Sequence, residues 1–439
     1  MNVNKFFELA KEAGLLESEV VIVRGSTTQM GVYKGAVENY SVATTITIAA
    51  RGIFNGKMGF ALSEKDDRTT PHYLIDQIKT SAGVSESDDL AIIFEGSEKY
   101  RRRNIFNREL AKISESDKLN NLFLIEKALF EREKRVTDVE SVVYVEQEND
   151  RRMFNSYGLK LMAKQNYYYY MANVVVREDG DTKTGYHIFL DNDHEKFDLG
   201  KFVGDVIHKA VTKLGGKPVP TKAYPVVLNP RVTASLLAAY LTNANAENVE
   251  KQTSLFIGKL NERVANAKIT VTDAPLTRNV FFTYFDDEGV AKFNKPIIQR
   301  GVLKTYLHNL STAKKAGVEP TGNAVNNGGK IGIGISNVVL RPGRKTFAEM
   351  ITPITEGVFI TEVMGLHSGL NPTSGDFSLQ ASGFVIRDGK LAEPVNLITV
   401  SGNLIKLFND VRDVANENEL QLSSYTTSSV YIKKLNIAG

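Results

Sequence analysis

The sequence predicts an α+β fold, with an N-terminal domain of helices packed on antiparallel meanders and a C-terminal β-rich domain. In the first half, segments with apolar residues at helical spacing enclose runs in which apolar and polar residues alternate. Turn signals separate these runs, and Asn55-Gly56 is typical of a tight hairpin. The second half is dense in Gly, Asn, Ser and Thr, a composition that together with alternating segments favours strands.

The first 83 residues predict a helix, a meander and a second helix. An amphipathic helix within Met1–Glu17 ends at Gly14, and Pro71–Gly83 has apolar residues on one face. The alternating residues between these helices predict the strands Val20–Val23, Gly31–Tyr33, Glu38–Ile48 and Met58–Leu62. The predicted turns are Arg24-Gly25, Lys34-Gly35, Arg51-Gly52 and Asn55-Gly56.

A similar order of elements follows a second time. Ser87–Asp117 is charge-rich and is predicted to be a connection. Leu119–Glu133 and Lys201–Leu214 are predicted helices, and the first has a predicted buried stripe of Leu122, Ile125, Leu129 and Phe130. The predicted strands between the helices are Val139–Gln147, Arg152–Asn155, Leu159–Val176 and Thr184–Phe189. This order suggests a pseudo-repeat of residues 1–115 and 116–216.

The segment Lys217–Pro220 contains two prolines and is the predicted domain boundary. It divides the chain into domains 1–216 and 217–439. Beyond it, Tyr224–Leu228 predicts a strand and Val232–Ala246 a helix.

Composition excludes several classes of protein. The 439 residues are 42% hydrophobic and 24% charged with a formal net charge of +3, so there is no electrostatic case for a nucleic-acid partner. The absence of cysteine excludes disulfides and thiolate ligands. No apolar run approaches the about 20 residues that span a bilayer, and the charged N-terminal helix is unlike a secretory signal. We therefore expect a cytoplasmic protein without a membrane partner.

The sequence predicts no catalytic residue, metal site or cofactor. No two of the six histidines stand three, four or five residues apart, so none form a helical metal-binding pair. Asp191, Asp193, His194 and Glu195 lack the spacing of a calcium loop and are interpreted as a polar turn. No GxSxG motif is present to suggest a serine nucleophile.

Three further segments have local interpretations. The glycine-rich Gly322–Gly334 precedes a strand-like run, which argues against a phosphate loop. The acidic Phe285–Gly289 is interpreted as a hairpin turn with solvated side chains, although a carboxylate pair at a site is an alternative. Tyr167–Tyr170 alternates between two faces of a predicted strand, with core on one face and an inter-domain contact on the other.

The stretch Gly365–Ile386 is the most distinctive in the chain. Turns at Ser368-Gly369 and Ser374-Gly375 enclose Asn371-Pro372, and an alternating run follows. Phe377, Leu379, Ala381 and Gly383 would lie on one side of the resulting strand, and Ser378, Gln380 and Ser382 on the other. The pattern predicts a loop that continues into a half-buried strand.

This stretch, NPTSGDFSLQASGF, resembles the TldD/PmbA family, the "modulator of DNA gyrase" proteins, and its PmbA/TldE branch in particular. Further similar steps occur in the same order along the chain: Asn155–Gly158, Asp286–Gly289, Gly301–Leu303, Thr321–Ala324, Asp388-Gly389, Pro394-Val395 and Gly402–Leu404. The resemblance therefore covers most of the chain.

The resemblance implies a cytoplasmic metalloprotease system. Its TldD member has an HExxxH zinc motif and a further cysteine ligand, and the PmbA/TldE member pairs with it around a cavity for unfolded peptides. The corresponding helix of this chain has Ala238, Ala239 and Asn243 near the motif positions, and alanine can neither bind zinc nor act as a base. The resemblance thus implies a non-catalytic subunit with a TldD-like partner, or a homodimer.

We expect peptide or partner binding at His367, Asn371, Asp376 and Phe377, in the loop and at the start of the strand. An extended peptide would pair with an exposed strand edge. One alternative is a stand-alone metal-dependent hydrolase or peptidase that uses carboxylates such as Asp286 and Asp287, with metal ligands dispersed in the sequence. Another is a nucleic-acid-linked regulator, which only the family's gyrase name supports.

Overall fold

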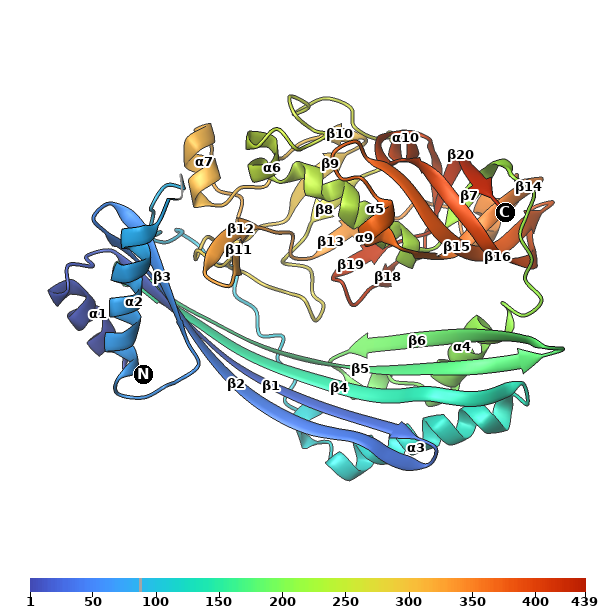
Figure 1. Cartoon of the computed structure of the whole chain (residues 1–439), viewed down its shortest axis with the longest axis horizontal. Coiled ribbons are helices and arrows are strands. Elements are labelled where there is room, and N and C mark those ends of the chain that lie inside the picture. Colours follow the sequence, from blue (N-terminus) through green and yellow to red (C-terminus); the bar gives the residue numbers. More distant parts are fainter. Residues whose placement is uncertain (87–88) are drawn as a thin grey trace.

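One six-stranded antiparallel sheet, in the order β3-β2-β1-β4-β5-β6, is formed by the first half of the chain (Figure 1). The computed structural model describes residues 1–86 and 89–439 and has the α+β fold that the sequence predicts. Ser87 and Asp88, at the start of the predicted connection Ser87–Asp117, lie outside the described residues. The strands are β1 (Ser18–Tyr33), β2 (Ala36–Phe54), β3 (Lys57–Ser63), β4 (Val136–Asn155), β5 (Lys160–Glu178) and β6 (Asp181–Asp191).

Two of the four predicted turns in the first meander are confirmed and two are wrong. Lys34-Gly35 and Asn55-Gly56 connect strands, and all four residues have positive φ, as the tight turns of hairpins require. At Arg24-Gly25 and Arg51-Gly52 the strands continue without a break. A Cβ atom on Gly25 would lie 2.9 Å from Thr45 Oγ1 of the paired strand. This glycine therefore permits a close approach of side chain to backbone within the sheet.

Four helices cover one face of this sheet. They are α1 (Val3–Glu12), α2 (Thr70–Val84), α3 (Glu115–Arg132) and α4 (Leu199–Val211). Val20 of β1 packs in the core beneath α1 and α2, and Met30 of the same strand face packs in the core beneath α3 and α4. Phe130, predicted to be buried, is 40% exposed, because it lies outside the stripe of α3 that packs on the sheet. Within the described residues, no helix is long and apolar enough to cross a membrane.

The opposite face of the sheet packs on the C-terminal half. Val21 and Met153 form an apolar cluster with Phe282 and Phe285. The four consecutive tyrosines also divide between the two faces: Tyr168 and Tyr170 are buried in the helix-side core. Tyr167 lies on the other face, with its ring centre 6.0 Å from that of Phe281. The face predicted for a contact outside the N-terminal core therefore contacts a residue of the C-terminal half.

Two further six-stranded sheets build the C-terminal half, in the orders β10-β9-β8-β13-β19-β18 and β16-β15-β14-β7-β20-β17. The first contains β8 (Val271–Asp273), β9 (Lys295–Gln299), β10 (Val302–Leu303), β13 (Val338–Leu340), β18 (Glu419–Leu420) and β19 (Tyr425–Thr427). The second contains β7 (Lys222–Leu228), β14 (Glu356–Met364), β15 (Asp376–Arg387), β16 (Lys390–Asn403), β17 (Val411–Val414) and β20 (Val430–Ala438).

The helix α5 (Pro230–Leu241) lies in the core that both of these sheets share (Figure 1). Leu236, Leu237 and Tyr240 of α5 are buried there. The remaining elements are a β-hairpin and short helices at the periphery: α6 (Ala246–Glu250), α7 (Leu310–Ala316), β11 (Ala324–Asn327), β12 (Lys330–Ile333), α8 (Phe347–Ile351), α9 (Leu366–Gly369) and α10 (Leu404–Asn409), with single 3₁₀ turns at Leu110–Lys112, His194–Lys196 and Thr242–Ala244. The hairpin β11–β12 occupies Gly322–Gly334, so that no helix follows these glycines.

Candidate functional site

The loop between α9 and β15 is fixed by its own polar groups. The Asn371 side chain accepts hydrogen bonds from the N–H groups of Thr373 (2.9 Å) and Ser374 (3.2 Å). The N–H of Asn371 donates to the carbonyl of Asp376, and the N–H of Gly375 donates to the carbonyl of Asn371, both at 2.8 Å. Such a side chain that closes its own turn is characteristic of asparagine. The loop is thus a defined, exposed structure.

Asp376 connects this loop to the neighbouring strand. Asn403, the last residue of β16, donates its side-chain N–H to Asp376 Oδ1 (2.9 Å) and to the carbonyl of Ser374 (2.8 Å). These bonds stabilise the carboxylate, and the pKa of Asp376 is lowered by the hydrogen bond from Asn403 and by that from Ser374. Asp376 is therefore an exposed, ionised acceptor at neutral pH.

The other two predicted residues of the loop site differ in exposure. His367 is exposed on α9. Phe377 is only 4% exposed and packs in the C-terminal core. The alternation predicted for the strand is present, since Leu379 and Ala381 are buried with Phe377 while Ser378 and Gln380 are exposed. Phe377 therefore supports the loop from beneath, and His367, Asn371 and Asp376 form its surface.

Asn243, just after the end of α5, binds a segment that lies against this loop. Its side chain is buried, donates to the carbonyl of Tyr240 (3.0 Å) and accepts the N–H of Leu255 (2.7 Å). Leu255 in turn lies against the loop, because a Cβ atom on Gly375 would stand 3.0 Å from Leu255 Cδ1. Ala238 and Ala239 are half-buried on α5. Leu255 therefore contacts both Asn243 and the loop.

In the acidic segment Phe285–Gly289 the side chains of Asp286 and Glu288 are buried and that of Asp287 is half-buried, so the prediction of solvated side chains is wrong. The Asp286 carboxylate is 1% exposed and accepts the N–H groups of Glu288, Val290 and Ala324. Asp287 pairs with Arg151 of β4 and accepts the N–H of Asn326 (2.6 Å). These carboxylates hold the turn and attach it to the first sheet.

Glu288 forms a second ion pair between the turn and the first sheet, and local sequence did not predict it. Arg51 lies between two carboxylates, 2.6 Å from Glu19 and 3.4 Å from Glu288, and all three residues are buried. Glu288 also accepts the N–H of Leu310 (2.8 Å). Burial raises its pKa to about 7. Arg51 had been interpreted as part of a turn, and no local pattern connects it with a residue 237 positions away.

The histidines do not converge. His187 faces Asp205 and Lys209, His194 packs among the rings of Tyr168 and Tyr170, and His308 contacts Thr312. In the described part of the chain, no group of three or more His, Asp or Glu side chains could hold a metal ion.

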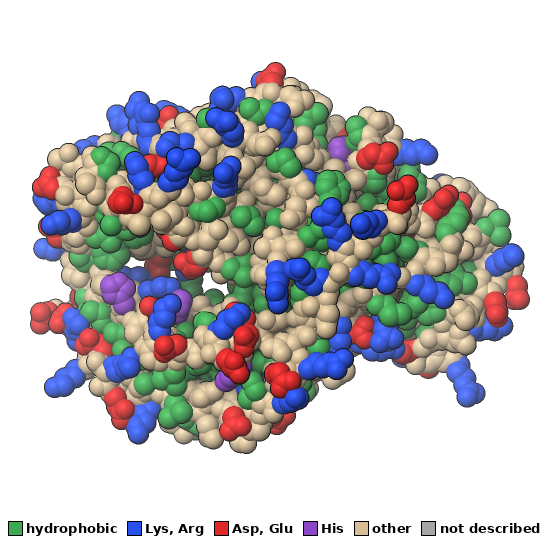
Figure 2. All heavy atoms as spheres, turned by 180° about the vertical axis from the view of Figure 1, so that it is seen from behind, with side chains coloured by type: hydrophobic (Ala, Val, Ile, Leu, Met, Phe, Trp, Pro, Cys, Tyr) green, Lys and Arg blue, Asp and Glu red, His purple; other side chains and the backbone are tan. Residues whose placement is uncertain are grey.

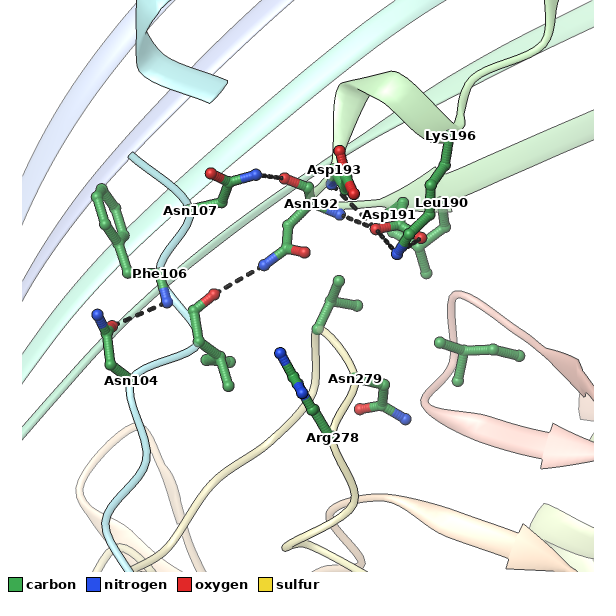
Figure 3. A pocket seen from close by; sticks show the side chains of 13 residues that line it. Asn104, Phe106, Asn107, Leu190, Asp191, Asn192, Asp193, Lys196, Arg278 and Asn279 are labelled. Carbon is green, nitrogen blue, oxygen red and sulfur yellow. Dashed lines mark hydrogen bonds and ion pairs between the residues drawn. The ribbon is translucent and has the colours of Figure 1, made fainter. Parts of the chain in front are cut away.

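A cavity of about 420 Å³ lies between the first sheet and the C-terminal half. Figure 3 shows Asp191, Asn192 and Asp193 on one wall, with Arg278 and Asn279 extending from the other. Lys196 forms an ion pair with Asp191 (3.1 Å). Asp191 and Asp193 of the predicted polar turn line the cavity, so this turn forms its rim. The reverse view in Figure 2 shows an opening between the two layers, with histidine, basic and acidic side chains around it.

Two further side-chain contacts join the first sheet and its helices to the C-terminal half. The ammonium group of Lys213 lies 2.7 Å from Glu362, and the guanidinium of Arg231 lies 4.5 Å from the ring centre of Tyr186. These contacts join the two layers within one chain.

Three protein-family models match consecutive parts of the chain. They are the PmbA/TldA metallopeptidase domain 1 (residues 18–77), central domain (108–214) and C-terminal domain (221–439). The chain belongs to the PmbA/TldD family. Its membership confirms the resemblance that the motifs indicate.

Relatives and solved structures agree with this family. The metalloprotease PmbA of Escherichia coli O157:H7 is 25% identical over 75% of this chain and 71% of its own length. A PmbA homolog of Buchnera aphidicola is 26% identical over 72% and 69%. A putative modulator of DNA gyrase from Thermotoga maritima superposes with a TM-score of 0.91 at 29% identity, and TldE from Thermococcus kodakarensis with 0.92 at 23%, each over 99% of both chains.

The residues of α5 and of the 3₁₀ turn after it do not fit the zinc that the name of this metallopeptidase family implies. Ala238 and Ala239 have no donor atom, and both polar atoms of the Asn243 side chain are used within the protein. Zinc sites in proteins need three or four His, Cys, Asp or Glu ligands, and a chain without cysteine has none of the thiolates. The family's metal chemistry has no ligand set on this helix.

Proposed function

We propose that this chain is the PmbA/TldE-like, non-catalytic subunit of a TldD-type cytoplasmic metalloprotease. In this role it binds unfolded peptides and docks the catalytic partner. The observation that carries the proposal is the residues near the positions of the family's metal motif: Ala238 and Ala239 on α5, and Asn243 in the 3₁₀ turn that follows it. The opening between the layers supports a role in holding an extended chain.

We propose that the surface for peptide or partner is the loop with His367, Asn371 and Asp376. The turn hydrogen bonds of Asn371 and the Asn403–Asp376 bond support it, because a loop held in one conformation loses little entropy on binding. Phe377 contributes from the core side by fixing the start of β15. The division into domains 1–216 and 217–439, with the pseudo-repeat, is part of the same proposal.

Hydrolysis of a reduced and carboxymethylated protein tests this function. The purified chain is assayed alone, with a purified TldD-type partner, and the partner is assayed alone. We expect hydrolysis to rise at least tenfold in the mixture over the partner alone, and the isolated chain to be inactive. Hydrolysis by the isolated chain would favour the alternative of a stand-alone hydrolase, and equal rates with and without this chain would contradict the proposal.

A further inference from the structure

The cavity between the first sheet and the C-terminal half is lined by segments far apart in the sequence. Asn104–Asn107 follow α2, and Leu190–Asp193 lie at the end of β6, with Lys196 just beyond. Arg278–Val280 and Leu420 of β18 line it from the C-terminal half. Its volume of about 420 Å³ lies within the roughly 300–1,000 Å³ of sites that bind small ligands. The cavity is therefore large enough for a short piece of another chain.

Asparagine side chains fix the wall on the side of the first sheet. Asn166 of β5, 1% exposed, accepts the N–H of Asn107 (2.9 Å) and donates to its carbonyl (2.8 Å). Asn107 Nδ2 donates to the carbonyl of Asn192 (2.6 Å), and Asn192 Nδ2 donates to the carbonyl of Ile105 (2.7 Å) (Figure 3). No described residue donates to the other amide atom, Asn192 Oδ1. A fixed wall thus offers one acceptor to a ligand.

A second pair of amides fixes the opposite wall. The side chains of Asn279 and the fully buried Asn337 donate to each other (3.2 and 2.9 Å). The Asn279 side chain also accepts the N–H of Phe281 (2.9 Å), and its own N–H donates to the carbonyl of Thr277 (2.9 Å). Arg278 lies within this turn, and its side chain extends into the cavity (Figure 3). The backbone on both sides therefore sets the direction of the arginine.

Arg278 is the cation of this lining that has no counter-charge. Throughout the described part of the chain, no residue forms a hydrogen bond or an ion pair with it. Lys196, the other cation, lies 3.1 Å from Asp191. A guanidinium presents its N–H groups in a planar fork, which binds a carboxylate through two parallel hydrogen bonds. Arg278 is thus suited to bind the carboxylate of a ligand.

The rest of the lining indicates which kind of carboxylate fits. Asn192 Oδ1 requires an N–H donor, which neither a phosphate nor a fatty acid has. Apolar surface is also present, from Ile105, Phe106, Leu190, Val280 and Leu420. A peptide offers a carboxylate, main-chain N–H groups and apolar side chains together. The chemistry of the cavity therefore matches a peptide better than a small inorganic anion.

We propose that this cavity binds the carboxylate of a peptide through Arg278, with a main-chain N–H of the same peptide donating to Asn192 Oδ1. The carboxylate is either the peptide's C-terminus or the side chain of an aspartate or glutamate. This site is separate from the loop with His367, Asn371 and Asp376, and it rests on the proposed peptide-binding function. It adds selection by charge, which pairing of the main chain with a strand edge does not provide.

Fluorescence anisotropy with the isolated full chain tests this site. The probes are a rhodamine-labelled pentapeptide of alanine and leucine with a free C-terminus, its C-terminal amide, and two such amides that contain one glutamate or one glutamine. We expect at least one carboxylate probe to bind at least about tenfold tighter than its neutral counterpart, and added salt to weaken this preference. The pair that shows the preference identifies the source of the carboxylate. Equal affinities within both pairs would overturn the proposal.

Variants test whether Arg278 causes the preference. Arg278→Gln should abolish it, and Arg278→Lys should keep only part of it, because an ammonium group lacks the planar fork. The exposed Arg412 of β17 lies outside the cavity, so Arg412→Gln is the matched control and should bind like the wild type. An unchanged preference in Arg278→Gln, or displacement of the probes by an equal concentration of inorganic phosphate, would contradict the proposal.

Asp193 distinguishes recognition of a carboxylate from recognition of a cation. It lines the same cavity and accepts the N–H of Glu195 (3.2 Å), a bond that asparagine can also accept. Asp193→Asn removes a negative charge and should strengthen the binding of the carboxylate probes. Weaker binding in Asp193→Asn together with unchanged binding in Arg278→Gln would mean that the cavity recognises a cation, and would overturn the proposal.

Hydrolysis in the mixture with a TldD-type partner separates this site from the proposed function. We expect Arg278→Gln to remove the preference for the carboxylate probe over its neutral counterpart, while the neutral probe is hydrolysed at the wild-type rate. If the mixture is active but shows no preference that depends on Arg278, the site is wrong and the proposed function stands. If the mixture is no more active than the partner alone, while the isolated chain binds the carboxylate probes through Arg278, the site stands and the proposed function is wrong.

Discussion

Arg51 Nη1 lies 3.4 Å from Glu288 Oε1, and this buried ion pair joins the first sheet to the C-terminal half. Arg51 also pairs with Glu19 at 2.6 Å, so one guanidinium serves two carboxylates. The excess negative charge and the burial both favour protonation of Glu288. The segment Asp286–Gly289, which resembles a family motif, thus connects the C-terminal half to the first sheet in this structure.

We predict that Glu288→Gln reduces the pH dependence of stability. The pKa of buried Glu288 is raised to about 7, above the ordinary value of 4.5. Its contribution to stability is therefore present below about pH 4.5 and is lost as the pH rises through about 7. Urea unfolding at pH 5 and pH 8 should show a difference in unfolding free energy that is roughly 2–3 kcal/mol smaller in the variant than in the wild type.

The exposed Glu393→Gln serves as the control for this titration and should leave the difference unchanged. If Glu288→Gln also leaves it unchanged, Glu288 does not titrate in this range.

Gly289 is expected to be intolerant of a side chain. Its φ is +84°, and a Cβ atom would lie 2.9 Å from Leu159 and 3.2 Å from Met153 of the first sheet. Gly289→Ala therefore combines backbone strain with crowding and should lower the unfolding free energy by about 2–4 kcal/mol. Gly258, with φ of +68° and open space around it, is the matched control. Gly258→Ala should cost about 1 kcal/mol, and equal losses at both positions would contradict the crowding.

Asn243 has a structural role that a variant can separate from binding. Asn243→Ala leaves the N–H of the half-buried Leu255 without its acceptor, so we expect a loss of about 1–3 kcal/mol in chemical denaturation. The half-buried Asn248 donates to the carbonyl of Thr242 (3.0 Å), and Asn248→Ala should cost less than 1 kcal/mol. A stable Asn243→Ala variant would show that the amide is free for another role.

We predict that substitutions in the loop with His367, Asn371 and Asp376 lower activity without lowering stability. Asp376→Ala removes an exposed carboxylate, and Asn371→Ala removes the acceptor that closes the turn. In the mixture with a TldD-type partner, each should lower the hydrolysis rate by roughly tenfold while the thermal midpoint changes by a few degrees at most. Glu393→Ala, an exposed acid of the same half, should have the wild-type rate. Unchanged rates in both loop variants would remove the site assignment.

Local patterns predicted the parts of this fold whose causes are local. The alternation from Phe377 to Gly383 matches the burial of β15, and the tyrosines at 167–170 divide between two faces as predicted. The failures involve distant partners. Local sequence predicts a turn at Gly25. The glycine instead allows a close contact with Thr45 on another strand, which local sequence does not reveal. The acidic turn was predicted to be solvated because Arg51 and Arg151 are separated from it by at least 135 residues.

In the candidate site too, local features could be predicted from the sequence and contacts between distant segments could not. The loop at Asn371 could be predicted from its turn residues, and its exposure agrees with that prediction. The connection of Asn243 to the loop through Leu255 required the structure, because both contacts depend on packing between segments far apart in the sequence.

The measurement that tests the central claim most directly is the zinc content of the purified chain and of its mixture with a TldD-type partner, determined by elemental analysis alongside peptide hydrolysis. We expect less than about 0.1 zinc per isolated chain, with no hydrolysis, and activity together with zinc only in the mixture. One tightly held zinc per isolated chain, with hydrolysis that a chelator abolishes, would contradict it.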